Sequence, residues 1–236
     1  MPEVSIILPS LRLDAALRTI KEFSVTNGNI DYEILVVSPF PVKEDRVVHI
    51  YEGKALGTIR AHNVAYENSS GKYILPWADD HYPTVNCISN MLSFVKSNVG
   101  PFIGSFRTKV QGKEVSQCCV YDRPYACFGC FSKQTVNLVG GYYDIAYGAH
   151  WADPDMALRT WEKGGKVKIC PNAWIIAEQI SDGLVTNNWN KYFEKDKETF
   201  LNRWHHKLGN GIARERVNKE WTLINKPIIF GGVKFI

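Results

Sequence analysis

Two adjacent carboxylates, Asp79 and Asp80, directly follow an apolar run over residues 73–76 that has the composition of a buried strand. Open α/β sheets bind their ligands at the carboxyl ends of such strands. Neighbouring like charges repel, and a hard divalent cation completed by substrate phosphates is a common way to hold them. The pair therefore indicates a site for a metal and a diphosphate. The alternative is an Asp-rich turn that caps the next helix, and the pair alone does not decide.

A third carboxylate, Asp153, precedes Pro154 at the start of a predicted helix. The pattern predicts Asp at the N-cap and Pro at the first helical position. Because the helix dipole favours negative charge there, we expect Asp153 to be ionised at neutral pH. Without further motifs, simple capping is the favoured role.

Elements that would position these residues follow an alternating pattern over the first hundred residues. Apolar runs predict strands at 4–8, 32–37, 47–50 and 73–77, and helical periodicity predicts helices at 13–23, 55–66 and 85–95. This alternation favours a parallel sheet with crossover helices.

In the second half of the chain, the regular alternation of strand and helix patterns ends. We expect a hairpin from 102–109 and 114–121, an extended run at 125–131, a short helix at 133–138 and strands at 167–170 and 173–177. Aromatic residues then follow a helical period from Trp189 to Leu208, which favours core packing over a face resting on a membrane. The expected organisation is a main domain over 1–182 and a helical extension over 183–236.

Composition gives only broad limits. The 236 residues are 45% hydrophobic and 22% charged, which is ordinary for a globular protein, and the net charge of +4 is too small to indicate nucleic-acid binding. Basic residues outnumber acidic ones from Trp189 onward. A solvated helix face is the favoured interpretation, and a peripheral contact with an anionic membrane is the alternative.

Localisation is expected to be cytoplasmic. The first residues lack the basic and long apolar regions of a signal peptide, and no segment reaches ~18 apolar residues. The six cysteines are then expected to be thiols. Cys127 and Cys130 have a zinc-ligand spacing, but core and strand cysteines are favoured.

Several motifs occur in a definite order. They are Pro9-Ser10 after the first strand, Gly57-Thr58-Ile59-Arg60-Ala61-His62-Asn63, Asp79-Asp80, Gly140-Gly141-Tyr142-Tyr143-Asp144, and Asp153-Pro154-Asp155-Met156-Ala157-Leu158-Arg159. Together, over about residues 3–180, they resemble the family 2 nucleotide-sugar glycosyltransferases of the GT-A fold. The resemblance implies an α/β fold of Rossmann-like type, with a mixed, mainly parallel sheet flanked by helices and a C-terminal helical extension.

The resemblance also implies residue roles. The favoured donor class is a UDP-sugar. The residues that would bind it are Pro9, Ser10, Arg60, Asn63 and Asp79. A Mn²⁺ or Mg²⁺ ion would be held by Asp80 and Asp79. Asp153 would be the general base of an inverting transfer to a hydroxyl of a carbohydrate, lipid-linked or protein acceptor. Trp151, Asp155 and Arg159 would lie on the acceptor side.

The sequence departs from the family pattern at several positions. Ala78 and Ala152 replace family carboxylates, residues 36–40 lack the Asp that reads the uracil, and residues 175–179 lack a His for the metal. A catalytically degenerate scaffold that binds nucleotide or glycan is therefore one alternative. A nucleotidyltransferase is ranked lower, because Arg12 follows the first strand without the glycine-rich loop expected there.

Overall fold

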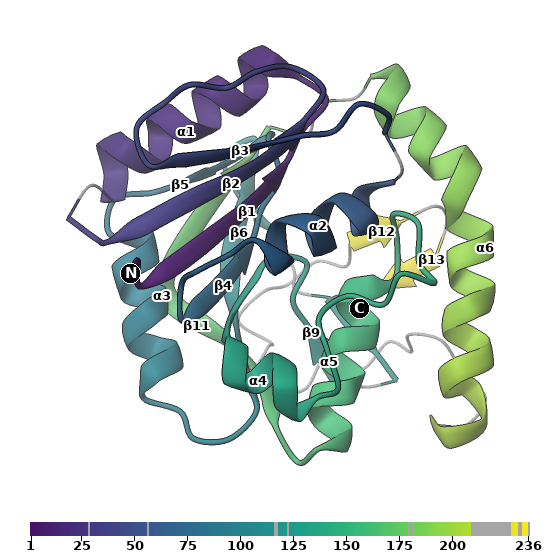
Figure 1. Ribbon diagram of the computed structural model, residues 1–236. Helices are drawn as coiled ribbons and strands as arrows, with labels where there is room; N and C mark the ends of the chain where they lie inside the picture. The colour runs from purple at the N-terminus through teal and green to yellow at the C-terminus, as the bar shows by residue number, and fades with distance from the viewer. Residues whose placement is uncertain are drawn as a thin grey trace.

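A mixed β-sheet covered by helices on both faces forms the centre of the molecule (Figure 1). The computed structural model describes residues 1–27, 29–55, 57–115, 118–121, 123–178, 180, 182–208, 228–230 and 233–235. The strands of this sheet are β1 (Val4–Pro9), β2 (Tyr32–Ser38), β3 (Val47–Tyr51), β4 (Tyr73–Pro76), β5 (His81–Pro83), β6 (Phe102–Val110), β7 (Lys113–Val115), β10 (Gly129–Ser132) and β11 (Lys166–Ala177).

The order of the strands explains why the sheet is mixed. Within the described residues it is β3-β2-β1-β4-β10-β6-β11-β5, with β7 paired to β6. Strands β1 to β4 are parallel, β10 is antiparallel to β4 and β6, and β5 is antiparallel to β11. The expected mixed and mainly parallel α/β sheet is confirmed.

Helices cover the two faces in separate groups. Helices α1 (Leu13–Asn27) and α3 (Cys87–Lys96) pack on one face, and α2 (Thr58–Glu67), α4 (Lys133–Leu138), α5 (Ala152–Glu162) and α6 (Gly183–Leu208) pack on the other. In β1, Ile6 and Leu8 join the first core, whereas Ile7 joins the second. Because both faces are buried, the strand is a continuous apolar run rather than an alternating one.

Most predicted elements are present, with several local differences; for example, the extended run predicted at 125–131 is divided between β9 (Arg123–Tyr125) and β10. Strand β5 was not predicted, because its three residues are too few to show a period. The strands predicted at 167–170 and 173–177 are one strand, β11, with a register shift between Ile169 and Trp174. The predicted strand at 114–121 corresponds to β7 and β8 (Cys118–Val120); β8 pairs with β9 (Arg123–Tyr125) in a separate small sheet.

Helix α6 runs along the second face, on the right in Figure 1. Phe193, Phe200 and Trp204 are buried in the same core as α2 and α5, with Trp189 and Leu208 partly buried beside them. The prediction that the aromatic stripe is core packing is therefore confirmed. This part of the predicted extension shares its hydrophobic core with the main domain.

Beyond α6, the predicted extension lies largely outside the described residues. Two short strands, β12 (Ile228–Phe230) and β13 (Val233–Phe235), pair antiparallel near the end of the chain. Among the helices that are described, none combines the length and apolar character needed to cross a bilayer.

Candidate active site

The carboxyl ends of β1 and β4 lie side by side, because the two strands pair in parallel with Ile7 opposite Pro76. Ser10 follows β1 and Asp79 follows β4, so the two predicted residues lie next to each other. The Ser10 hydroxyl donates to Asp79 Oδ2 at 2.6 Å, and both side chains are buried. Thr19 on α1 donates to the Asp79 carbonyl at 3.0 Å, which fixes the backbone as well. The two strand ends therefore meet through a buried hydrogen bond between Ser10 and Asp79.

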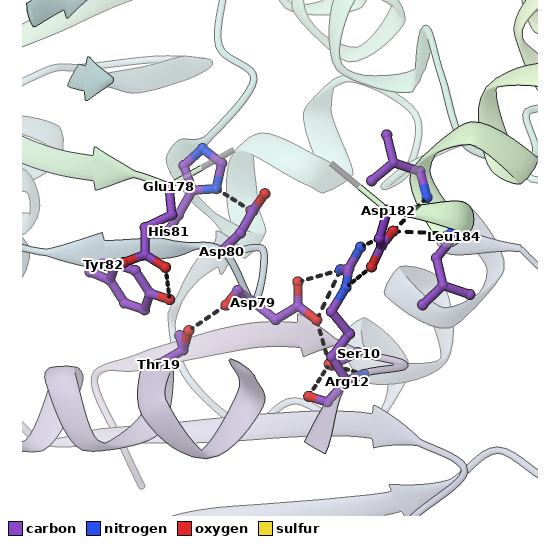
Figure 2. Close-up of polar contacts among 11 residues, drawn as sticks. Ser10, Arg12, Thr19, Asp79, Asp80, His81, Tyr82, Glu178, Asp182 and Leu184 are labelled. Carbon is purple, nitrogen blue, oxygen red and sulfur yellow. Dashed lines mark hydrogen bonds and ion pairs between the residues drawn. The ribbon is translucent and has the colours of Figure 1, made fainter. Parts of the chain in front are cut away.

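Arg12 joins this pair to the distant N-terminus of α6 (Figure 2). Its Nη1 donates to Asp79 Oδ1 at 3.0 Å, while Nε and Nη2 donate to the two oxygens of Asp182 at 2.7 and 2.9 Å. Asp182 Oδ1 in turn accepts the backbone N–H groups of Leu184 and Val185 at 3.0 and 3.1 Å. Asp182 therefore caps α6 and pairs with Arg12 at the same time. We call Ser10, Arg12, Asp79 and Asp182 the strand-end cluster.

Asp80 points away from this cluster, toward His81 (Figure 2). His81 Nδ1 donates to Asp80 Oδ1 at 2.6 Å. Asp79, by contrast, has both carboxylate oxygens engaged by Ser10 and Arg12. Within the described part of the chain, no group of three or more His, Cys, Asp and Glu side chains could hold a metal ion. The possible metal ligands that lie beside each other here are thus the Asp80 carboxylate and the His81 imidazole, which are hydrogen-bonded to each other.

The two adjacent carboxylates have opposite pKa shifts. Burial raises the pKa of Asp79, and this effect outweighs the hydrogen bond from Ser10 and the charge of Arg12. Burial would also raise the pKa of Asp80, but the hydrogen bond from His81 and the nearby positive charges outweigh it and lower the pKa. Asp80 is therefore the carboxylate of the pair that is held ionised, as a metal ligand must be.

A shallow groove of about 430 Å³ opens beside Arg12. The first turns of α1 form one wall, and Tyr82 and Glu178 lie on the other. Arg18 spans it, because its guanidinium lies 4.4 Å from the centre of the Tyr82 ring and pairs with Glu178. Arg12 is thus the member of the strand-end cluster that lines this groove, whereas Ser10 and Asp79 are buried behind it.

Asp153 lies in a second cluster, at the start of α5. The expected N-cap is wrong: Trp151 occupies that position, and Asp153 lies in the first turn. The Asp153 carboxylate instead accepts a short hydrogen bond from the hydroxyl of buried Tyr143. Burial raises the pKa of Asp153 to about 7, although the Tyr143 hydrogen bond acts in the opposite direction. Asp153 is therefore partly protonated at neutral pH and not simply ionised as expected, because desolvation outweighs the helix dipole.

Asp155 is fully buried and holds several elements together. Arg159 Nε donates to Oδ2 at 2.8 Å, and the Trp204 indole and Arg203 Nη1 donate to Oδ1, each at 2.9 Å. Arg159 also donates to three backbone carbonyls of the 139–142 segment. The predicted Asp155 and Arg159 thus contact each other, but as a structural pair of a buried carboxylate and a partly buried guanidinium that holds the segment before Tyr143.

The remaining predicted residues lie in different surroundings. Trp151 is 6% exposed and packs on Phe193 and Phe200, so its ring is in the core rather than presented to a sugar. Asn63 donates to the Ile59 carbonyl of its own helix at 2.9 Å. Pro9, at the end of β1, is partly buried, and Arg60, on α2, is exposed to solvent.

Several residues of these clusters, among them Arg12, Tyr143 and Arg203, had no assigned role in the sequence-based site. Arg12 was considered only for a nucleotidyltransferase, although its place directly after the first strand was a usable signal. Tyr143 lies within the Gly140–Asp144 motif, but nothing in its spacing points to Asp153. Arg203 lies 48 residues after Asp155, so only the fold brings them together.

Comparison with known proteins identifies the fold. No protein-family model and no curated protein matches the sequence. Among solved structures, GalNAc-T7 with UDP, GalNAc and Mn²⁺ matches with a TM-score of 0.63 at 10% identity, over 85% of this chain and 50% of the other. The TarS 1–349 fragment of S. aureus with UDP-GlcNAc matches with a TM-score of 0.60 at 13% identity, over 87% and 73% of the two chains.

A third similar structure is the mannosyltransferase PcManGT from Pyrobaculum calidifontis in complex with GDP-Man and Mn²⁺. Its TM-score is 0.61 at 12% identity, over 85% of this chain and 64% of that one. At these identities the likeness concerns the fold, which is the GT-A, Rossmann-like fold of glycosyltransferases. The chain spans about half of the length of GalNAc-T7.

Proposed function

We propose that this protein is a glycosyltransferase that moves a sugar from a nucleoside-diphosphate donor to an acceptor hydroxyl, with inversion at the anomeric carbon. The observation that carries the proposal is the contrast between Asp80 and Asp153. The pKa of Asp80 is lowered, whereas that of Asp153 is raised to about 7. A metal ion that binds a diphosphate needs an ionised carboxylate as a ligand, and a general base works best with a pKa near the working pH.

The donor is assigned to the side of the strand-end cluster. Ser10 and Asp79 lie at the ends of the two central parallel strands, where ligands of open α/β sheets bind. We assign Asp79 to the ribose, with Pro9 beside the nucleoside and Arg60 and Asn63 on the nucleotide side. The nucleotide-sugar complexes among similar structures, with UDP, UDP-GlcNAc and GDP-Man, support a donor of this class. UDP-sugars are the first donors to test.

Asp80 and His81 are the residues that would hold a Mn²⁺ or Mg²⁺ ion. They are adjacent, one is ionised, and such ions are commonly completed by substrate phosphates and water. Asp79 was predicted beside Asp80 as a ligand, but its engagement with Ser10 and Arg12 makes the donor role the better assignment. The chemistry such an ion supplies is neutralisation of the charge on the departing diphosphate.

Asp153 is assigned as the general base. As the acceptor oxygen attacks the anomeric carbon, its proton passes to Asp153, and the bond from that carbon to the diphosphate oxygen breaks. The hydrogen bond from Tyr143 holds the carboxylate in one orientation. Trp151, Asp155 and Arg159 then shape the acceptor side from within the core, by fixing the segments on either side of the base.

A second candidate is a nucleotide-binding scaffold without transferase activity. The observation that favours it is that the described residues contain no group of three metal-ligating side chains. Ala152 also stands where the family pattern has a second acidic residue before the base. The two candidates predict the same nucleotide binding and differ only in turnover.

A screen of nucleotide binding followed by turnover tests the proposal. Thermal unfolding would be measured with UDP, GDP, CDP and dTDP, each with and without Mn²⁺, because a ligand that binds only the folded state raises its stability. Metal-dependent stabilisation by one nucleotide, together with donor hydrolysis or transfer, supports the glycosyltransferase. Binding without turnover across many acceptors favours the scaffold, and no binding by any nucleotide contradicts both.

A further inference from the structure

Asp196, in the middle of α6, is a fully buried carboxylate. It accepts three consecutive backbone N–H groups: Gly148 donates to Oδ1 at 2.9 Å, and Ala149 and His150 donate to Oδ2 at 2.9 and 2.8 Å. A buried charge is costly unless hydrogen bonds replace its water, and three amides do so here. The 148–150 segment is therefore held to α6 in one conformation, three residues before Asp153.

Packing holds the same segment from two further directions. The Gly148 carbonyl accepts the N–H of Ile59 at the start of α2, at 3.1 Å. The Tyr192 ring of α6 lies so close that a Cβ at Gly148 would be 2.1 Å from its Cδ1 atom. Gly148 is thus enclosed between two helices, and only a residue without a side chain fits without displacing the ring.

Helix α6 also holds the residues around Asp153 from its last third. Arg203 pairs with Asp144, the residue after Tyr143, and with Asp155. Trp204 donates to Asp155 at 2.9 Å. The contacts from α6 therefore fall on both sides of Asp153 in the sequence and on the segment that carries its partner Tyr143.

We propose that Asp196 is a positioning residue for Asp153, and that α6 is consequently a working part of the acceptor half of the site. This inference rests on the proposed function, because it assumes that Asp153 is the base. Asp196 acts through the 148–150 amides, which set where the first turn of α5 begins. The groups around Asp153 are Tyr143, which donates to it, and Tyr142 and His62, which pack against Tyr143.

The test compares Asp196→Asn with Glu198→Gln, an exposed acid on the same helix. Hydrogen exchange of the 148–150 amides should be slow in the natural protein and at least tenfold faster in Asp196→Asn, because a neutral amide has one acceptor oxygen. The value of kcat should fall roughly 10- to 100-fold, while nucleotide affinity stays unchanged, because the base is displaced and the donor side is not. Glu198→Gln should match the natural protein in each measurement.

Two results would overturn the inference: unchanged exchange, or faster exchange with unchanged kcat. If the natural protein transfers no sugar, the proposed function fails, and NMR titration of the Asp153 carboxyl then decides the positioning role. A changed Asp153 titration in Asp196→Asn supports that role, and an unchanged one contradicts it.

If Asp196→Asn does not fold, Gly148→Ala provides the second test. The added methyl should displace the segment and lower kcat, and Tyr192→Ala in the same chain should restore part of it by making room. Unchanged kcat and unchanged exchange in Gly148→Ala would overturn the inference. If the natural protein shows no turnover, the NMR titration of the Asp153 carboxyl is compared between these variants in place of kcat.

Discussion

The guanidinium of Arg12 forms a two-pronged ion pair with Asp182, 170 residues further along the chain, while its remaining nitrogen contacts Asp79. One side chain therefore links the end of β1, the end of β4 and the start of α6. Because the guanidinium fork matches a carboxylate in two places, lysine cannot reproduce the geometry. The proposed donor side thus depends on Asp182, a residue at the N-terminus of α6.

Arg12→Lys should weaken nucleotide binding by roughly tenfold, since the charge-assisted hydrogen bonds that orient Asp79 are lost and ~1.4 kcal/mol corresponds to a factor of ten. Calorimetric titration with the best nucleotide would measure this. Arg18→Gln is the matched control, because Arg18 lies in the same groove but makes an exposed ion pair. Equal affinities for the two variants would remove Arg12 from the donor site.

Asp182 should make folding stability depend on pH in the acidic range. Its pKa is lowered to about 2, chiefly by the hydrogen bonds from Arg12. A lowered pKa means that the stabilisation is complete above the ordinary Asp value of about 4 and is lost as the pH falls through about 2. Asp182→Asn should therefore lose stability at pH 6 and differ less from the natural protein at pH 2. Denaturant unfolding would measure the free energy of unfolding of both proteins at both pH values. The same difference at pH 6 and at pH 2 would mean that the Arg12–Asp182 ion pair does not cause the pH dependence.

Asp153→Asn should abolish transfer, with a loss of roughly 10²- to 10⁴-fold for a general base. In the natural protein, kcat should rise with pH through about 7 as Asp153 loses its proton. Retained turnover in Asp153→Asn would exclude the base assignment.

The same substitution should raise stability at alkaline pH. A raised folded-state pKa means that the protonated form is favoured, so stability is lost as the pH increases from about 4 to about 7. Asp153→Asn should remove that loss and be more stable at pH 8 by roughly 1–3 kcal/mol, at ~1.4 kcal/mol per pKa unit with a reduction for partial exposure. Thermal unfolding at pH 5 and pH 8 measures the difference, and equal pH dependence in both proteins would contradict a buried acid.

Tyr143→Phe should move the acid limb of the kcat profile to higher pH. The Tyr143 hydroxyl donates to Asp153 and lowers its pKa, so its removal should raise that pKa above about 7. Tyr66→Phe is a control, since the Tyr66 ring stacks on Tyr142, next to Tyr143 in the sequence. A limb that stays in place would mean that the hydroxyl does not act on the base.

Asp80→Ala and His81→Ala should each remove the metal dependence of nucleotide binding. In the natural protein, a nucleotide at 100 times its Kd should stabilise the fold by roughly 2.7 kcal/mol in the presence of Mn²⁺. Asp45→Asn is the control, because that carboxylate is 98% exposed at the surface. Full metal dependence in Asp80→Ala would show that the ion binds elsewhere.

Local sequence suffices to predict the central strands, because runs such as Val4–Pro9 are apolar on both faces, as expected for strands buried between helix layers. It also determined that Asp79 and Asp80 follow a strand of that kind, which defines the edge of the sheet where they lie. These features depend on residues close in the chain, whose periodicity is visible without a fold.

The tertiary structure alone decided which side chains meet and how they ionise. Arg12 contacts Asp182, and Asp196 contacts Gly148, although these residues are far apart in the sequence and their spacing gives no sign of the contact. For Asp153, local sequence predicted an ionised helix cap, whereas burial beside Tyr143 raises the pKa to about 7. The physical reason is that hydrogen bonds and desolvation act over a few ångströms, and neighbours at that distance come from any part of the chain.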